Sequence, residues 1–173
     1  MPSEPDTPAS PSGAGLPTGR FSGREAFRQQ VRDALACAAH EGWREIIVCD
    51  SGFEDWPLGE RVVAESLQAW SKTGRRFTML ARNFDHVVAQ HSRFVTWRRT
   101  WSHIIDCHAC RSADPLELPS AIWSAGWMLQ RLEVVHCTGV SSAEPARSAR
   151  LRAELDGWLH RSTPAFPATT LGL

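Results

Sequence analysis

Residues 44–85 read REIIVCDSGFEDWPLGERVVAESLQAWSKTGRRFTMLARNFD and decide the fold class of this chain. The stretch holds a short apolar run at 45–50, an acidic turn that contains glycine, an amphipathic segment at 58–71 and a second apolar run at 76–81. Two apolar runs separated by a helical pattern are typical of a βαβ unit, in which the two strands are parallel. Ligands of such sheets bind at the carboxyl ends of the strands. The stretch therefore predicts a parallel strand pair and places a candidate site beside Asp50.

The rest of the chain continues the alternation of helices and strands. Its spacing of apolar residues predicts helices at 22–41, 83–94 and 142–161, strands at 102–107, 121–129 and 132–137, and a connector at 97–101. This order indicates an α/β sandwich with a mostly parallel mixed sheet and helices on both faces. We expect a single domain at 21–162, a disordered tail at 1–20 and an extended tail at 163–173.

Composition excludes several classes of protein. The chain has 173 residues, with 19 Lys and Arg against 19 Asp and Glu, and its formal net charge is zero. Dedicated nucleic-acid binders usually carry a basic face and a raised pI, so this balance argues against nucleic acid as a partner. No run of about 18 apolar residues occurs, so no membrane-spanning helix is expected. Five cysteines without a secretory signal predict a cytoplasmic protein with reduced thiols.

The order of elements resembles one half of a phospholipase D-like fold. The likeness rests on the run 46–50, the turn 53–58, the step from 67–70 to 75–80, and the closing segment 155–162. Active members of that family carry His-x-Lys followed by an Asp, but Lys72 is the only lysine here and Trp70 stands two positions before it. The resemblance therefore implies a degenerate half domain without phosphodiester chemistry. Because active enzymes of the family assemble their site from two halves, it also implies a homodimer.

Polar side chains cluster where the first two predicted strands end. Asp50 and Asp55 follow the first strand, and Asp85 and His86 follow the second. Adjacent parallel strands would bring these residues together, and a histidine beside a carboxylate can act in acid–base catalysis. A hydrolase or phosphotransferase is therefore one alternative function. In the competing interpretation, Asp50 caps a helix and Asp55 pairs with an arginine.

The motif Cys107-His108-Ala109-Cys110 is a candidate metal site. With His136 from a neighbouring strand, Cys107, His108 and Cys110 would complete four zinc ligands. However, side chains alternate along a strand, so the two cysteines point to opposite faces unless the strand ends between them. A buried free cysteine commonly packs as a small apolar residue. Zinc is therefore an alternative only, and no cofactor is expected.

Tryptophan is unusually frequent, with eight tryptophans and no tyrosine. The candidate ligand or interface residues are Trp97, Arg98, Arg99, Trp101, Trp123 and Trp127. Tryptophan is enriched at interfaces, and alternating Trp and Arg planes can stack on bases or hold an anion. In the competing interpretation, these residues cover the edge of the core. The leading prediction is a non-catalytic α/β module that binds a partner protein, a small ligand or a second copy of itself.

Overall fold

The computed structural model describes residues 15–168, so the tails predicted at 1–14 and 169–173 lie outside the described residues. Its elements in chain order are β1 (Gly19–Ser22), α1 (Arg24–Glu41), β2 (Glu45–Cys49), α2 (Arg61–Ser71), β3 (Arg76–Ala81), α3 (Asp85–Gln90), α4 (Ser92–Thr100), η1 (Ser102–Ile104), β4 (Ile105–Ala109), β5 (Ser120–Trp123), β6 (Met128–Glu133), β7 (Thr138–Ser142), α5 (Pro145–Arg161) and β8 (Thr163–Pro164). These ranges confirm the predicted α/β class.

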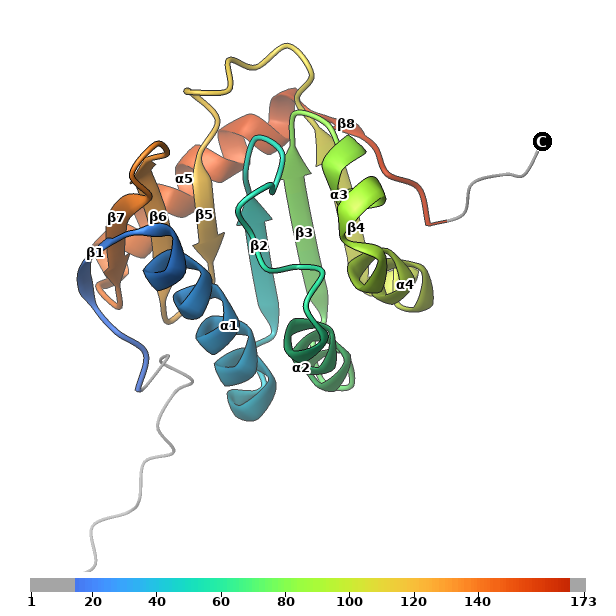
Figure 1. The fold of residues 1–173 in the computed structure, drawn as a ribbon, viewed down its shortest axis with the longest axis horizontal. Helices are drawn as coiled ribbons and strands as arrows, with labels where there is room; N and C mark the ends of the chain where they lie inside the picture. The colour runs from blue at the N-terminus through green and yellow to red at the C-terminus, as the bar shows by residue number, and fades with distance from the viewer. Residues whose placement is uncertain (1–14, 169–173) are drawn as a thin grey trace, which may run out of the picture.

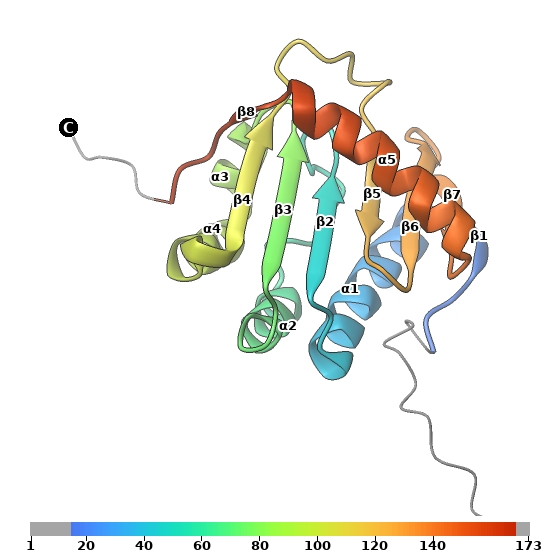
Figure 2. The same ribbon diagram turned by 180° about the vertical axis from the view of Figure 1, so that it is seen from behind.

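One mixed sheet forms the centre of the described chain. The strand order is β1-β7-β6-β5-β2-β3-β4-β8. Helices α1, α2, α3 and α4 cover one face of this sheet (Figure 1), and α5 crosses the opposite face (Figure 2). The prediction of helices on both faces is therefore confirmed. None of the helices between residues 15 and 168 is long and apolar enough to span a membrane.

Parallel pairing is restricted to the middle of the sheet. Strand β3 pairs in parallel with β2 on one side and with β4 on the other. The other five pairs of the described sheet are antiparallel. The βαβ unit is confirmed, but the prediction of a mostly parallel sheet is wrong. Strands β5, β6 and β7 follow one another through short turns, and such turns join antiparallel strands.

Several element boundaries differ from the prediction. The helix expected at 83–94 is two helices, because the backbone leaves the helical conformation at His91 (φ −116°, ψ 57°). The connector expected at 97–101 instead forms the end of α4, up to Thr100, with Trp101 as its C-cap. The strand expected at 121–129 is instead β5, a turn and the start of β6, and the strand expected at 132–137 holds only the end of β6 and the turn before β7. Gly19 and Arg20, expected in the tail, belong to β1 and pair with β7.

Each face of the sheet buries its own apolar cluster. Ile46 and Val48 pack under α1 to α4, whereas Ile47 and Cys49 pack under α5. Side chains alternate along a strand, so β2 contributes to both clusters. All four residues are at most 1% exposed. The end of β2 is thus held rigidly from both sides, which fixes the position of the polar residues that follow it.

An ion-pair group joins α1 to the start of α2. Arg32 donates to the two Glu60 carboxylate oxygens at 2.7 and 2.9 Å, and Arg28 donates at 3.0 Å. These hydrogen bonds lower the pKa of Glu60 from 4.5 to about 2, and those from Arg32 have the largest effect. A carboxylate with a depressed folded-state pKa stabilises the fold above its unfolded pKa. That contribution is lost as the pH falls from 4.5 towards 2.

We expect Glu60→Gln to remove this part of the acid dependence. The variant loses about 1 kcal/mol of unfolding free energy at neutral pH, and its difference from wild type shrinks as the wild-type carboxyl becomes protonated. Urea denaturation at a series of pH values measures the difference. Glu65→Gln is the matched control, because Glu65 is 67% exposed and pairs with the 82%-exposed Arg61. A deficit that stays constant down to acid pH would contradict the assignment.

Candidate functional site

A buried arginine on β6 binds the two carboxylates that follow β2. The Arg131 Nη2 donates to Asp50 Oδ1 at 3.0 Å, and its Nη1 donates to Asp55 Oδ2 at 2.8 Å. Its Nε donates to the Ser120 hydroxyl at 3.1 Å, and the guanidinium carbon lies 4.7 Å from the centroid of the Phe27 ring. The side chains of Arg131 and Asp50 are 3% and 7% exposed. This group is therefore a mostly buried ion-pair network at the carboxyl end of β2, and its four polar residues line a cavity of about 330 Å³.

The second oxygen of Asp50 shapes the turn after β2. It accepts the backbone N–H groups of Gly52 at 3.1 Å and Phe53 at 2.7 Å. Phe53 has a φ of 60° and a fully buried ring. A left-handed conformation is costly for a bulky residue, so the carboxylate stabilises a turn that the backbone alone disfavours. Asp50 thus caps a turn rather than a helix, and Asp55 pairs with an arginine as the competing interpretation stated.

The structure does not assemble the four residues predicted as a catalytic cluster. Asp50 and Asp55 share one arginine, whereas Asp85 is exposed at the start of α3. The His86 ring packs against the buried His91 ring, with centroids 5.2 Å apart. No hydrogen bond or ion pair joins the two halves of the cluster within the described chain. The enzyme alternative therefore has no assembled acid–base pair at this position.

The predicted zinc ligands are also apart. Cys107 belongs to the core under α1 to α4 and Cys110 to the core under α5, as strand alternation indicates. Burial raises the pKa of the Cys107 thiol to about 12, whereas a zinc ligand must be a thiolate. His136 lies at the surface, with its ring 3.0 Å from Glu133. Among residues 15–168, no group of three or more His, Cys, Asp or Glu is placed to hold a metal.

Half of the predicted aromatic interface lies in the core. Three of its residues are at most 7% exposed, namely Trp97, Arg98 and Trp127, and three are at least partly accessible, namely Arg99, Trp101 and Trp123. Trp97 Nε1 donates to Ser71 Oγ at 2.7 Å, and Trp127 Nε1 donates to the Pro17 carbonyl at 3.0 Å. The interface prediction is corrected for Trp97 and Trp127, because their rings and indole N–H groups are already used inside the fold.

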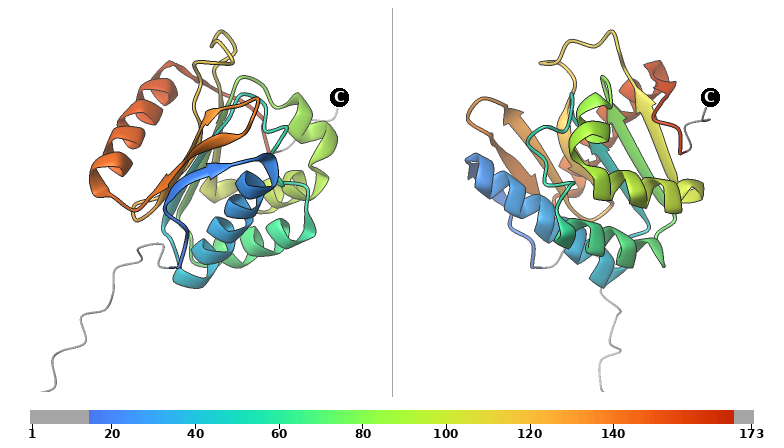
Figure 3. Two further views of the ribbon diagram at one scale, coloured as in Figure 1. Left: turned by 60° about the vertical axis from the view of Figure 1, so that its left-hand side comes forward. Right: turned by 45° about the vertical axis from the view of Figure 1, so that its right-hand side comes forward.

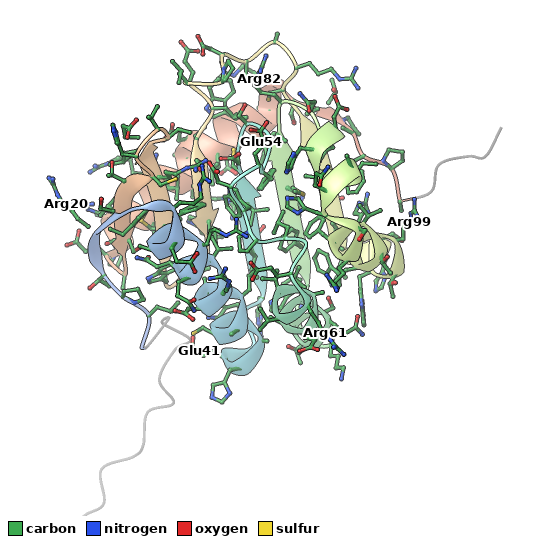
Figure 4. The ribbon with its side chains drawn as sticks, viewed as in Figure 1. Arg20, Glu41, Glu54, Arg61, Arg82 and Arg99 are labelled. Carbon is green, nitrogen blue, oxygen red and sulfur yellow. The ribbon has the colours of Figure 1, made fainter. Side chains whose placement is uncertain are left out.

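Arginines gather around a cavity that the sequence analysis did not single out. This arginine cavity has a volume of about 490 Å³ and lies between α3, α4 and the segment after β8. Its lining includes Arg82, Arg99 and Arg111 but a single carboxylate, that of Asp85. None of the three arginines forms an ion pair within residues 15–168. Figure 4 shows Arg82 at the strand-end rim and Arg99 on the β8 side of the molecule.

The cavity is assembled from separate segments of the chain. Arg82 follows β3, Arg99 lies near the end of α4, and Arg111 follows β4. The right-hand view of Figure 3 shows α3 and α4 on the same side of the molecule as β4 and the chain that follows α5. One local signal was present in the sequence, because residues 86–105 contain three arginines and no Asp or Glu. Arg82 directly follows the strand predicted at 76–81, where a polar rim was expected, whereas nothing local marked Arg111.

Comparison with solved structures finds chains with a similar fold. No protein-family model and no curated protein matches this chain. Its fold is similar to the solved structure of TrmBL2, an archaeal chromatin protein that shows a novel mode of DNA binding. The TM-score is 0.63 at 11% sequence identity, and the match covers 88% of this chain and 55% of the TrmBL2 chain. The chain thus spans about half the length of that protein, and the likeness shows the fold alone.

This similarity corrects the function predicted from the sequence. The prediction of a module for a partner protein or small ligand set nucleic acid aside, yet this fold occurs in a chromatin protein that binds DNA. Zero net charge does not support that exclusion, because net charge sums over the whole chain, whereas a polyanion responds to local charge. The hydrolase, phosphotransferase and zinc alternatives are not retained either. The phospholipase D-like resemblance stays a prediction.

Proposed function

We propose that this protein binds DNA and that the arginine cavity contacts the DNA phosphates. The observation that carries the proposal is the presence of Arg82, Arg99 and Arg111 beside a single carboxylate in a chain of zero net charge. Guanidinium groups bind phosphate through paired, charge-assisted hydrogen bonds. The fold shared with a DNA-binding chromatin protein supports the same conclusion.

The chemistry of this cavity favours backbone recognition over sequence readout. Contacts to phosphate position a protein on DNA but carry no sequence information. Each phosphate contact changes the slope of log K against log salt by about −0.9, so three contacts predict a slope of about −2.7. A neutral chain with three phosphate contacts should therefore bind DNA weakly at physiological salt and more tightly at low salt.

Neutralising two of the cavity arginines tests this function. We expect the double variant Arg99→Gln/Arg111→Gln to weaken DNA binding at low salt and to bring the salt slope from about −2.7 to about −0.9. Fluorescence anisotropy of a fluorescein-labelled DNA duplex, titrated at several salt concentrations, measures both quantities. A variant that keeps the wild-type slope would remove the cavity from the proposal.

Arg61→Gln is the matched control for charge. Arg61 is exposed on α2, pairs with Glu65, and lies at the edge of the molecule opposite Arg82 in Figure 4. Arg61→Gln also removes one positive charge. If only the net charge of the protein mattered, this variant would weaken DNA binding by half as much as the double cavity variant. We expect a slope equal to that of wild type. If the wild-type protein does not bind the duplex at low salt, the function itself is wrong.

A further inference from the structure

A buried guanidinium lies behind the arginine cavity without a full set of hydrogen-bond partners. Arg98 is 7% exposed, and its Nε and Nη1 have no hydrogen-bond partner within the described chain. The Cys107 thiol lies against it, and the Phe166 ring centroid is 5.9 Å from its guanidinium carbon. Buried charged groups are normally paired and hydrogen-bonded. Arg98 therefore retains donors that suit an anion.

The chain after α5 covers this guanidinium. Phe166 lines the arginine cavity and stacks on Phe84, with ring centroids 5.3 Å apart and an interplanar angle of 15°. The same ring lies over Arg98, so it forms the cavity wall next to the buried charge. We name residues 163–168 the strap. Arg98 is adjacent on α4 to Arg99, which lines the arginine cavity.

The strap is held to the sheet by few bonds. Strand β8 has two residues and pairs with β4 only at His108 and Ala109. One further backbone bond runs from the Ala165 N–H to the Cys107 carbonyl at 3.0 Å. Phe166 has a φ of 48°, a conformation that bulky residues rarely adopt. A short and strained segment at a sheet edge belongs to the part of a fold that opens most readily.

We propose that the strap is a displaceable cover and that a DNA phosphate entering the arginine cavity displaces Phe166 and pairs with Arg98. This inference rests on the proposed function. The exchange replaces a ring contact by charge-assisted hydrogen bonds to Nε and Nη1, which have no partner in the covered state. Because only the uncovered state exposes Arg98, the apparent affinity for DNA is reduced by the fraction of molecules that are covered.

The first test measures DNA affinity in a variant with a weakened cover. Phe166→Ala removes the ring and leaves an L-residue at the strained φ, so the covered state loses its contacts with Phe84 and Arg98. We expect this variant to bind the labelled duplex at least about threefold more tightly, and we expect Phe166→Ala/Arg98→Gln to lose that gain. Leu116→Ala is the control, since Leu116 is 86% exposed and lies outside the arginine cavity.

The second test measures the cover without DNA. Cys107 is 4% exposed under the strap, and burial keeps its pKa near 12, so alkylation of this thiol is slow in the covered state. We expect Phe166→Ala to raise the alkylation rate at Cys107 at least about threefold, as mapped by peptide mass spectrometry. Cys49, fully buried under α5, should keep its wild-type rate in the same sample.

The outcomes separate the strap from the DNA-binding function. Unchanged alkylation at Cys107 shows that Phe166 is not a cover and overturns the inference. If the cavity variants weaken DNA binding while Phe166→Ala and Arg98→Gln leave it unchanged, the proposal of a displaceable strap is wrong. The proposed DNA-binding function then still stands. If the wild-type protein does not bind DNA, the phosphate role of Arg98 fails together with the proposed function.

Discussion

Replacing Arg131 with methionine is expected to lower the free energy of unfolding by about 3–5 kcal/mol. Methionine fills much of the same volume but donates no hydrogen bond to Asp50, Asp55 or Ser120. Asp50 is then a buried carboxylate without its cation, and removing one partner of a buried pair is strongly destabilising for this reason. Burial alone lowers the pKa of Arg131, yet Asp50 and Asp55 raise it above its usual value, so the guanidinium is charged in the folded protein.

Chemical denaturation followed by far-UV circular dichroism measures the effect. In the double variant Arg131→Met/Asp50→Asn, the orphan charge is gone while an oxygen still accepts the N–H groups of Gly52 and Phe53. We expect it to recover about 1–2 kcal/mol of the loss. Arg61→Met, at an exposed pair, should change stability by less than about 1 kcal/mol. An Arg131→Met loss as small as that of the control would show that the buried network contributes little.

Replacing Trp70 with alanine is expected to cost about 3–5 kcal/mol. Trp70 on α2 is fully buried, and its Nε1 donates to the Trp43 carbonyl at 2.6 Å. Its ring meets Phe77 edge to face, with centroids 5.9 Å apart. The same ring occupies the space that a Cβ on Gly74 would need, which explains the glycine after α2. Alanine would leave a cavity between α2 and β3 and an unpaired carbonyl at Trp43.

The matched control for Trp70→Ala is Trp101→Ala. Trp101 is partly exposed, and its Nε1 donates to the Gln68 side chain at the surface. Its removal should cost about 1 kcal/mol, because little apolar area returns to water and no buried polar group loses its partner. Circular dichroism is again the readout, since both variants remove a fluorophore. Equal losses in the two variants would contradict the assignment of Trp70 as the core anchor of α2.

The local pattern of apolar residues in the sequence determined the parallel part of the sheet, strands β2, β3 and β4. The apolar run at 76–81 became β3 with the expected bounds, and the run at 45–50 became β2 and the turn-capping Asp50. These elements are recoverable from sequence because hydrophobic periodicity and turn residues act within a few positions of one another. The opposite faces of Cys107 and Cys110 follow from the same rule, since alternation along a strand is a property of the backbone itself.

Tertiary structure alone decided the antiparallel half of the sheet and both polar sites. Arg131 and Asp50 are 81 positions apart in the chain, and nothing local to either residue specifies their pairing. The arginine cavity likewise draws Arg82, Arg99 and Arg111 from three separate segments of the chain. Strand register and the packing of the strap against β4 bring these groups together, and both depend on contacts summed over the whole core. The sequence by itself determined which segments are helices and strands in the centre of the molecule. Only the folded chain decided where its charges meet, because electrostatic interactions depend on distance in space and not along the chain.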